Sequence, residues 1–277
     1  MNLVAQSPTF SESQARELAA IAQPKAIEKI SERAFRLRNP SSDKGAVQVW
    51  CDAREIDHAW MPEGRRFADL KLLAMDMDST LITIECIDEL GDMAGKKPEI
   101  AGITARAMRG EIDYPESLRR RVALLAGLQE SALEAVYRER LQLTPGAEAL
   151  VFACKRSGVK LLLVSGGFTF FTERLKARLG LDYTISNTLQ IERGRITGKI
   201  LGDLVGAEAK AAKFVSVLKE LHSPREKSVA IGDGANDLKM MAEAGVSIAF
   251  NAKPIVKAQA TCAITWSGLD GVVNLFE

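Results

Sequence analysis

The chain has 277 residues, of which 47% are hydrophobic and 26% are charged, as in an ordinary globular protein. Its 37 basic and 36 acidic residues nearly cancel, so the overall charge does not favour nucleic acid or a membrane surface as a partner. The start of the chain does not read as a secretory leader, no run reaches the roughly 20 apolar residues of a membrane span, and the four cysteines form no CxxC pair. We therefore expect a cytoplasmic protein with reduced thiols.

Residues 1–66 are predicted to form a small α+β module. The stretch SESQARELAAIAQ has helical periodicity behind a serine start signal. AFRLR and AVQVWC are predicted to be short strands, separated by the turn-rich NPSSDKG. MPEGRRFAD is the expected linker to the second part, residues 71–277.

From residue 71 onward, short apolar strands alternate with amphipathic helices. The predicted strands are KLLAMD, VKLLLVSGG, YTISN, SVAIGDG and SIAF. This alternation predicts a doubly wound, Rossmann-like α/β core, in which helices cover both faces of a parallel sheet. Residues 84–143 interrupt the alternation because they have only helical character. We expect them to form a cap above the carboxyl edge of the sheet, where open α/β sheets bind ligands.

Polar residues follow the predicted strands at this edge. The first strand ends in Asp76 and Asp78, the second in Ser165 and Gly166, and the third leads to Asp233. Burying carboxylates at a strand end is costly unless a cation or hydrogen-bond donors compensate. The same edge also contains Gly167, Gly234, Asn236 and Asp237, and Lys210 lies near the start of a helix.

These residue types fit the hydrolysis of a phosphate ester, which needs a nucleophile, a proton donor and positive charge. Asp76 can attack phosphorus and form an aspartyl-phosphate. Asp78 can protonate the leaving oxygen and then activate water, a double role that predicts a raised pKa for Asp78. Mg²⁺ prefers oxygen ligands, and we expect Asp76, the backbone carbonyl of Asp78 and Asp233 to hold it.

The remaining residues of the edge fit the binding of a phosphoryl group. The hydroxyl of Ser165 and the backbone N–H of Gly166 can hold phosphate oxygens. Lys210 adds positive charge beside the nucleophile. Asn236 either binds the phosphate or orients its neighbours, and Asp237 fixes either Lys210 or a metal-bound water. Each motif alone would also fit a solvated strand end or a plain turn.

In this order, DMDSTL, VSGGF, Lys210 and GDGANDLKMM resemble the motifs of the haloacid dehalogenase-like superfamily of phosphotransferases. Within that superfamily, IECIDEL, MRGEIDYPESLRRRV and SGGFTFF are similar to the phosphoserine phosphatase family. The resemblance extends from about Leu72 to the C-terminus. It implies Mg²⁺-dependent hydrolysis of O-phospho-L-serine through an aspartyl-phosphate intermediate, the last step of L-serine biosynthesis.

The same resemblance implies how the cap chooses its substrate. Glu85 would pair with the ammonium of the substrate and Arg121 with its carboxylate, whose geometry the planar guanidinium matches. Met108 and Tyr114 would close the pocket and exclude water. The stretch SLRRRV contains three arginines, and the resemblance favours Arg121 because it lies eleven residues beyond Gly110, as in the family pattern. Tyr114 stands where the family often has phenylalanine.

Several alternatives stay open at this point. A related phosphatase would act on another small phosphorylated metabolite, although Glu85 and Arg121 together argue against a sugar phosphate. Transfer of the phosphoryl group to an alcohol such as homoserine is a further option. The N-terminal module resembles the regulatory amino-acid-binding (ACT-like) modules, and ligand sensing, packing and homodimer formation are its candidate roles.

Overall fold

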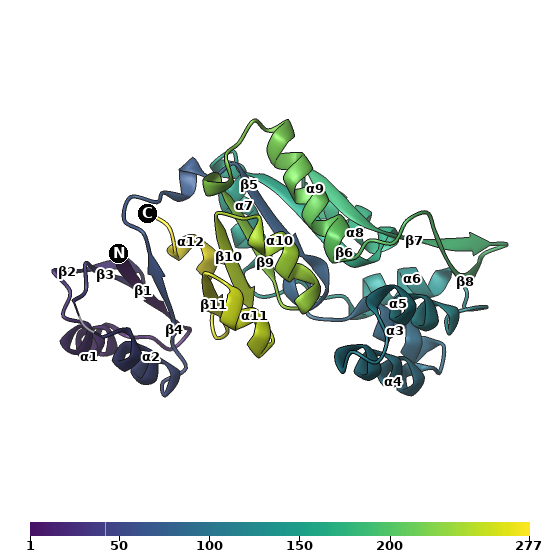
Figure 1. Ribbon diagram of the computed structural model, residues 1–277, viewed down its shortest axis with the longest axis horizontal. Helices are drawn as coiled ribbons and strands as arrows, with labels where there is room; N and C mark the ends of the chain where they lie inside the picture. The colour runs from purple at the N-terminus through teal and green to yellow at the C-terminus, as the bar shows by residue number, and fades with distance from the viewer. Residues whose placement is uncertain (42) are drawn as a thin grey trace.

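The protein consists of three parts that lie in a row: an N-terminal module, an α/β core and a helical cap (Figure 1). The computed structural model describes residues 1–41 and 43–277. Within these residues, we find no helix with the length and apolar character that crossing a membrane requires.

The N-terminal module is a four-stranded antiparallel sheet in the order β2-β3-β1-β4, with two helices on one face. Leu3, Phe35 and Leu37 of the sheet pack against Leu18 and Val47 of the two helices. The elements are β1 (Asn2–Gln6), α1 (Glu12–Ala22), β2 (Ala26–Ser31), β3 (Ala34–Arg38), α2 (Lys44–Asp52) and β4 (Asp57–Met61).

The stretch AVQVWC, predicted as a strand, belongs to helix α2, so this prediction is wrong. Val47 and Cys51 lie one helical turn apart and are buried, whereas Val49 between them is 71% exposed. Asp43 caps the helix by accepting a hydrogen bond from the N–H of Gly45. The apolar residues Val47, Val49 and Cys51 alternate as in a strand, but the buried positions follow the helical period.

The core is a seven-stranded sheet in the order β11-β10-β9-β5-β6-β7-β8. Six strands run parallel, and the predicted doubly wound α/β fold is confirmed. The edge strand β8 departs from the parallel expectation because it returns antiparallel to β7 in a hairpin. The strands are β5 (Leu72–Asp76), β6 (Lys160–Phe168), β7 (Tyr183–Glu192), β8 (Arg195–Leu201), β9 (Ser228–Gly232), β10 (Val246–Phe250) and β11 (Cys262–Ile264).

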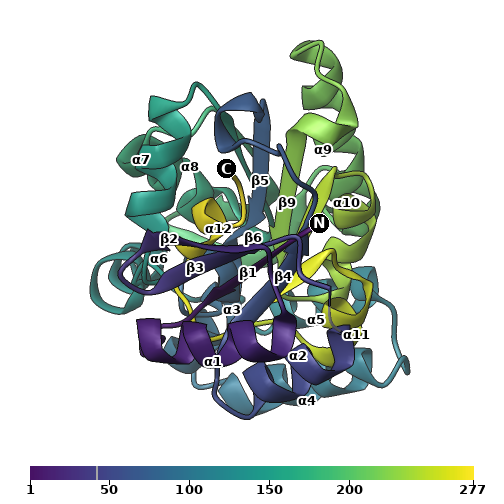
Figure 2. The ribbon, with the colours of Figure 1, turned by 90° about the vertical axis from the view of Figure 1, so that its left-hand side faces the viewer.

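Helices cover both faces of this sheet because alternate side chains of its strands are apolar on opposite faces. Leu72 and Ala74 of β5 face α9 (Ala207–Glu220), α10 (Leu238–Ala242) and α11 (Pro254–Gln259). Leu73 and Met75 face the other side, which is covered by α7 (Ala147–Arg156), α8 (Thr169–Leu179) and α12 (Gly271–Asn274). Val4 and Met61 belong to the same cluster as Leu73, so the N-terminal sheet packs against the core through the face that its own helices leave open (Figure 2).

The cap follows β5 and consists of α3 (Cys86–Met93), α4 (Lys97–Met108), α5 (Tyr114–Ala123), α6 (Ser131–Ala135) and a last turn at Val136–Arg140. The hairpin β7–β8 extends from the core to this cap (Figure 1). Backbone hydrogen bonds join them: the N–H of Gly127 donates to the carbonyl of Ile196, and the N–H of Ile196 to that of Leu128. The cap is therefore supported at a point far from its own two connections to the core.

Candidate active site

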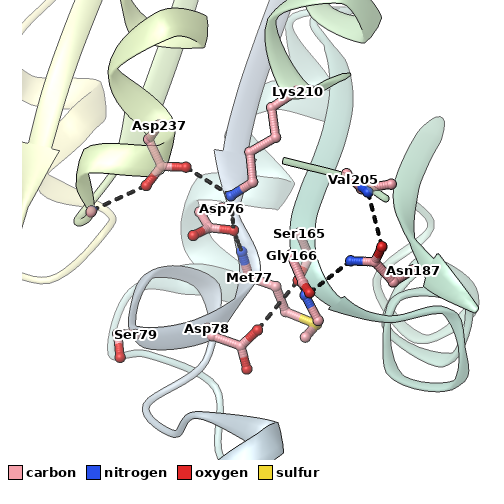
Figure 3. Close-up of polar contacts among 12 residues, drawn as sticks. Asp76, Met77, Asp78, Ser79, Ser165, Gly166, Asn187, Val205, Lys210 and Asp237 are labelled. Carbon is pink, nitrogen blue, oxygen red and sulfur yellow. Dashed lines mark hydrogen bonds and ion pairs between the residues drawn. The ribbon is translucent and has the colours of Figure 1, made fainter. Parts of the chain in front are cut away.

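Four segments bring polar side chains together at the carboxyl edge of the sheet, beneath the cap. They are the end of β5, the end of β6, the start of α9 and the turn after β9 (Figure 3). These segments are far apart in the sequence, and each enters the site because a parallel strand or its following helix ends there.

Asp76 is the last residue of β5 and is buried, with 5% of its surface exposed. Its Oδ1 accepts a hydrogen bond from the N–H of Met77 and another from Nζ of Lys210, each over 2.8 Å. Burial and the negative charge of Asp237 raise the pKa of Asp76 well above its usual value, against the opposing effect of Lys210. A second positive charge beside Asp76 would therefore favour its ionised form.

Lys210 lies in the first turn of α9 and is fully buried. Its Nζ bridges two carboxylates, since it donates to Asp237 Oδ1 over 2.8 Å as well as to Asp76. Burial acts to lower the pKa of Lys210, but the carboxylates of Asp237 and Asp76 raise it above its usual value. The lysine is thus a fixed cation, and Asp237 holds it beside Asp76.

Asp78 lies in the turn after β5, in which Ser79 adopts a left-handed backbone with φ of +55°. The Oδ1 of Asp78 accepts the N–H of Cys86 over 2.8 Å, and its Oδ2 accepts the hydroxyl of Ser165 over 3.3 Å. Desolvation raises the pKa of Asp78, the direction expected for a group that donates a proton.

The end of β6 forms a close-packed loop at residues 165–167, here called the phosphate loop. The buried hydroxyl of Ser165 accepts the N–H of Gly167 over 2.8 Å. A Cβ on Gly167 would lie 2.8 Å from Asp78 Oδ2, and one on Gly166 would overlap the hydroxyl of Tyr114. Both glycines are therefore required by the close approach of neighbouring side chains.

Three carboxylates gather where the sequence predicts a metal site. Oxygen atoms of Asp76, Asp233 and Asp237 all lie within 4.8 Å of one another. Burial and the charge of Asp237 raise the pKa of Asp233 to about 6. A cluster of carboxylate oxygens from two buried side chains and one half-buried side chain fits a hard divalent cation. The side chain of Asp78 is directed to Cys86 and Ser165 instead, and Asp237 supplies the third carboxylate.

Asn236 lies in the turn after β9 and is half-buried. Its side chain folds over Gly234, where an added Cβ would overlap the amide oxygen of Asn236. The N–H of Gly234 donates to Asp237 Oδ2 over 3.1 Å. The turn is thus built around Asp237, and Asn236 lies beside the carboxylates.

Glu85 precedes helix α3 at the start of the cap, where its Oε1 accepts the hydroxyl of Ser79 over 2.7 Å. Although Glu85 reaches solvent, desolvation of its carboxylate and the negative charges of Asp78 and Asp233 raise its pKa to about 7. The structure therefore places Glu85 within electrostatic reach of the catalytic candidates.

Arg121 is the half-buried member of the three arginines on α5. Arg119 and Arg120 are exposed, and Arg120 pairs with Glu116. Within residues 1–41 and 43–277, Arg121 forms no ion pair with a carboxylate, and its Nε donates weakly to the carbonyl of Ser117 over 3.4 Å. Its guanidinium is thus available to an external anion.

The two predicted closing residues occupy different positions. The hydroxyl of Tyr114 lies 3.1 Å from the carbonyl oxygen of Val205 and 3.4 Å from that of Gly166. Burial raises the pKa of Tyr114, so its hydroxyl keeps its proton and acts as a donor. Met108, at the end of α4, is 65% exposed and is not brought into the cluster.

Asn187 is a residue of the site that the sequence did not single out. It lies on β7 and is buried, with 1% exposed. Its Nδ2 donates to the carbonyl of Gly166 over 2.8 Å, and its Oδ1 accepts the N–H of Val205 over 2.9 Å (Figure 3). An asparagine at the end of a predicted buried strand was the available signal, because a buried amide needs partners at both ends.

Comparison with known proteins identifies relatives of the chain. Residues 73–242 match the family of haloacid dehalogenase-like hydrolases. A phosphoserine phosphatase of Polaromonas sp. is 53% identical over 217 residues, which are 76% of this chain and 92% of the relative. The confirmed resemblance is therefore to both the superfamily and its phosphoserine phosphatases.

Two solved structures are similar over almost the whole chain. A probable phosphoserine phosphatase from Vibrio cholerae, unliganded, has a TM-score of 0.86 and 36% identity, and the match covers 99% of this chain and 86% of the other. A haloacid dehalogenase family hydrolase from Salmonella enterica serovar Typhi has a TM-score of 0.90 and 30% identity, covering 100% and 98%. Both matches include the N-terminal module.

Proposed function

The chain belongs to the haloacid dehalogenase-like hydrolases, and we propose that it hydrolyses O-phospho-L-serine to L-serine and phosphate. The observation that carries the proposal is the joined set of Asp76, Lys210 and Asp237, with Asp78 held beside it by Ser165. In this proposal Asp76 is the nucleophile, Lys210 is the fixed cation and Asp78 is the carboxyl group of raised pKa. The activity of the Polaromonas relative supports phosphoserine as the substrate.

In the first step, a carboxylate oxygen of Asp76 attacks phosphorus and the bond from phosphorus to the serine oxygen breaks. Asp78 gives its proton to that oxygen, for which its raised pKa suits it. Lys210 and the phosphate loop offset the charge on the phosphoryl oxygens. The products of this step are L-serine and an aspartyl-phosphate at Asp76.

In the second step, the carboxylate of Asp78 takes a proton from water, and the oxygen of that water attacks phosphorus. The bond between Asp76 and phosphorus breaks and phosphate is released. Asp78 is protonated again at the end of the cycle. The bonds to Cys86 and Ser165 keep its carboxyl group in one position for both proton transfers.

We propose Mg²⁺ as the cation, held by Asp76, Asp233 and the backbone carbonyl of Asp78, with Asp237 close by. When bound, the ion supplies positive charge to the phosphoryl oxygens and orients them. Its charge also offsets the mutual repulsion of Asp76, Asp233 and Asp237, which lie close together.

Substrate choice is assigned to the cap. Glu85 pairs with the ammonium group of phosphoserine, and Arg121 pairs with its carboxylate through two parallel N–H groups. Asn236 and the N–H of Gly166 contribute to phosphate binding, and the exposed Met108 keeps only its predicted role in closing the pocket. Arg121 is preferred over Arg119 because it is half-buried while Arg119 is exposed, and over Arg120 because Arg120 is exposed and already pairs with Glu116.

The wider biological role follows from this reaction. A phosphoserine phosphatase would complete L-serine biosynthesis in the cytoplasm, with a small-molecule substrate and without a nucleic-acid or membrane partner. The N-terminal module, residues 1–66, is proposed to be ACT-like, with a regulatory role or a role in homodimer formation. Its strand order and its two helices on one face support that comparison.

Release of phosphate from four substrates tests the proposal. O-phospho-L-serine is compared with phosphothreonine, glycerol phosphate and a sugar phosphate, each with Mg²⁺ and with EDTA, and Asp76→Asn is the inactive control. We expect a strong preference for phosphoserine that EDTA and the substitution abolish. Equal, slow turnover of all four substrates would contradict the roles of Glu85 and Arg121.

A further inference from the structure

A small network of hydrogen bonds joins the cap to two loops of the core. On the core side, Asn187 binds both loops: its Nδ2 donates to the carbonyl of Gly166 in the phosphate loop, and its Oδ1 accepts the N–H of Val205. The second loop leads into α9, whose first turn carries Lys210. The side chain of Asn187 therefore fixes the phosphate loop relative to the segment that positions Lys210.

On the cap side, Tyr114 binds the same two loops. Its hydroxyl lies within hydrogen-bond distance of the carbonyl oxygens of Val205 and Gly166, and its one proton serves one of them at a time. Because Asn187 holds both loops, it sets the spacing of the two oxygens that receive the hydroxyl of Tyr114.

Two glycines of the core leave room for this tyrosine. A Cβ on Gly166 would overlap the hydroxyl, and a Cβ on Gly206 would lie 3.3 Å from the ring carbon Cδ1. The backbone of Gly206 is extended, with φ of −113°, so its conformation does not itself require glycine. The lack of a side chain at these two positions thus fits the seating of the ring.

We propose that Asn187 is a positioning residue, which acts through Tyr114 to hold the cap closed over the phosphate loop. The proposal rests on the proposed function and deepens it, because closure would retain phosphoserine while Asp78 and Lys210 act. A phenylalanine at position 114 would fill the same space without the hydrogen bond. The tyrosine therefore adds a polar contact to a closure that otherwise depends on ring packing.

The first test is Tyr114→Phe, measured by steady-state kinetics with O-phospho-L-serine. Loss of one hydrogen bond in the closed state should lower kcat/KM by roughly threefold to tenfold. The loss should come from a higher KM with kcat unchanged or raised, since a looser cap releases product faster. Tyr183→Phe is the matched control because the hydroxyl of Tyr183 bonds Glu220 on the surface, and its kinetics should equal those of the wild type.

A double-mutant cycle then tests whether Asn187 acts through Tyr114. If it does, Asn187→Ala should lower kcat/KM by a smaller factor when Tyr114 is already phenylalanine. The fold-loss of the double variant is then smaller than the product of the two single fold-losses. Gly206→Ala, whose Cβ would crowd the ring of Tyr114, should raise KM in the same way if Asn187→Ala does not fold. Multiplicative losses from Asn187→Ala and Tyr114→Phe, or an unchanged KM in both Tyr114→Phe and Gly206→Ala, would overturn the proposal.

Amide hydrogen exchange separates this proposal from the proposed function, because it needs no turnover. In the protein without substrate, amides of residues 109–123 should exchange faster in Tyr114→Phe than in the wild type, and Tyr183→Phe should match the wild type. Faster exchange in Tyr114→Phe, found together with a wild-type protein that does not hydrolyse phosphoserine, would overturn the proposed function. It would still support the contact between cap and core. Unchanged exchange would overturn the role of Tyr114.

Discussion

Lys210 is fully buried between the carboxylates of Asp76 and Asp237, an arrangement in which each charge depends on the others. Removing one member of a buried charged set leaves the remaining charges uncompensated. Lys210→Met should therefore lower the free energy of unfolding by about 3–5 kcal/mol, measured by urea titration without metal. Lys239→Met breaks only an exposed pair with Glu208 and should cost far less, because solvent screens an exposed pair. Equal losses in the two variants would contradict the buried network.

The raised pKa of Glu85 predicts how substrate recognition depends on pH. With a pKa of about 7, Glu85 is increasingly neutral below that pH, and a neutral carboxyl group cannot pair with the ammonium of phosphoserine. The kcat/KM for phosphoserine should therefore fall as pH decreases below 7, relative to that for an aryl phosphate without an ammonium group. Glu85→Gln should remove this relative decrease. A constant ratio of the two substrates in the wild type would contradict the pairing.

At the residue scale, the sequence predicted the residues that lie within motifs more successfully than those that act between loops. The expected raised pKa of Asp78 is confirmed, and of the two roles considered for Asp237 the structure shows the contact with Lys210. Asn187 was missed because its role depends on a hydrogen bond with Val205, a loop residue eighteen positions away. No local pattern specifies that contact.

At the scale of elements, the hairpin β7–β8 supports the cap through close backbone packing. Gly198 of β8 has φ of +82°, and a Cβ there would lie 3.0 Å from Ala126 Cβ and 3.2 Å from the backbone of Ala123. Gly202 has a similar φ of +72° with open space around it. Both positions therefore require a left-handed backbone conformation, but only Gly198 lies close to the cap.

This pair predicts a difference in stability. Gly202→Ala should cost about 1 kcal/mol, the strain of a left-handed backbone with a side chain. Gly198→Ala adds a clash with the cap and should cost about 1–3 kcal/mol more. Thermal unfolding of both variants measures the difference. Equal melting temperatures would show that the hairpin and the cap do not pack as described.

Prediction at the element scale succeeded where period and flanking residues agreed. Strands β5, β6, β7, β9 and β10 were recognised from their short apolar runs, whereas the three-residue strand β11 was not predicted. The strand prediction for the α2 segment was wrong because its apolar residues alternate along the sequence, although its buried positions follow the helical period. Strand β8 was missed because it has only one buried residue and therefore lacks a buried apolar stripe.

At the scale of the whole molecule, the N-terminal module is attached to the core by apolar packing and by polar contacts, and the carboxylate of Asp57 makes one group of these contacts. Asp57 of β4 is buried and accepts the N–H groups of Thr265, Trp266 and Ser267, over 2.6, 3.1 and 2.7 Å. Asp57→Ala would leave these groups without their acceptor and should lower the free energy of unfolding by about 2–4 kcal/mol. Asp52→Ala, at an exposed aspartate, should change it by less than about 0.5 kcal/mol.

Hydrogen exchange at Trp266 and Ser267 reports this attachment directly. Their amides should exchange much faster in Asp57→Ala than in Asp52→Ala. The sequence indicated a separate module but not this attachment, since Asp57 and Ser267 are 210 positions apart. Contacts at such separation depend on the complete fold.

The central claim is that Asp76 becomes phosphorylated during hydrolysis of phosphoserine. The most direct measurement uses O-phospho-L-serine that is radiolabelled in its phosphate group. Turnover is quenched with acid, and the labelled protein is analysed by peptide mapping. We predict label on the peptide that contains Asp76 and its loss in Asp76→Asn. Turnover of phosphoserine with no labelled protein, or with label on another peptide, would contradict the account.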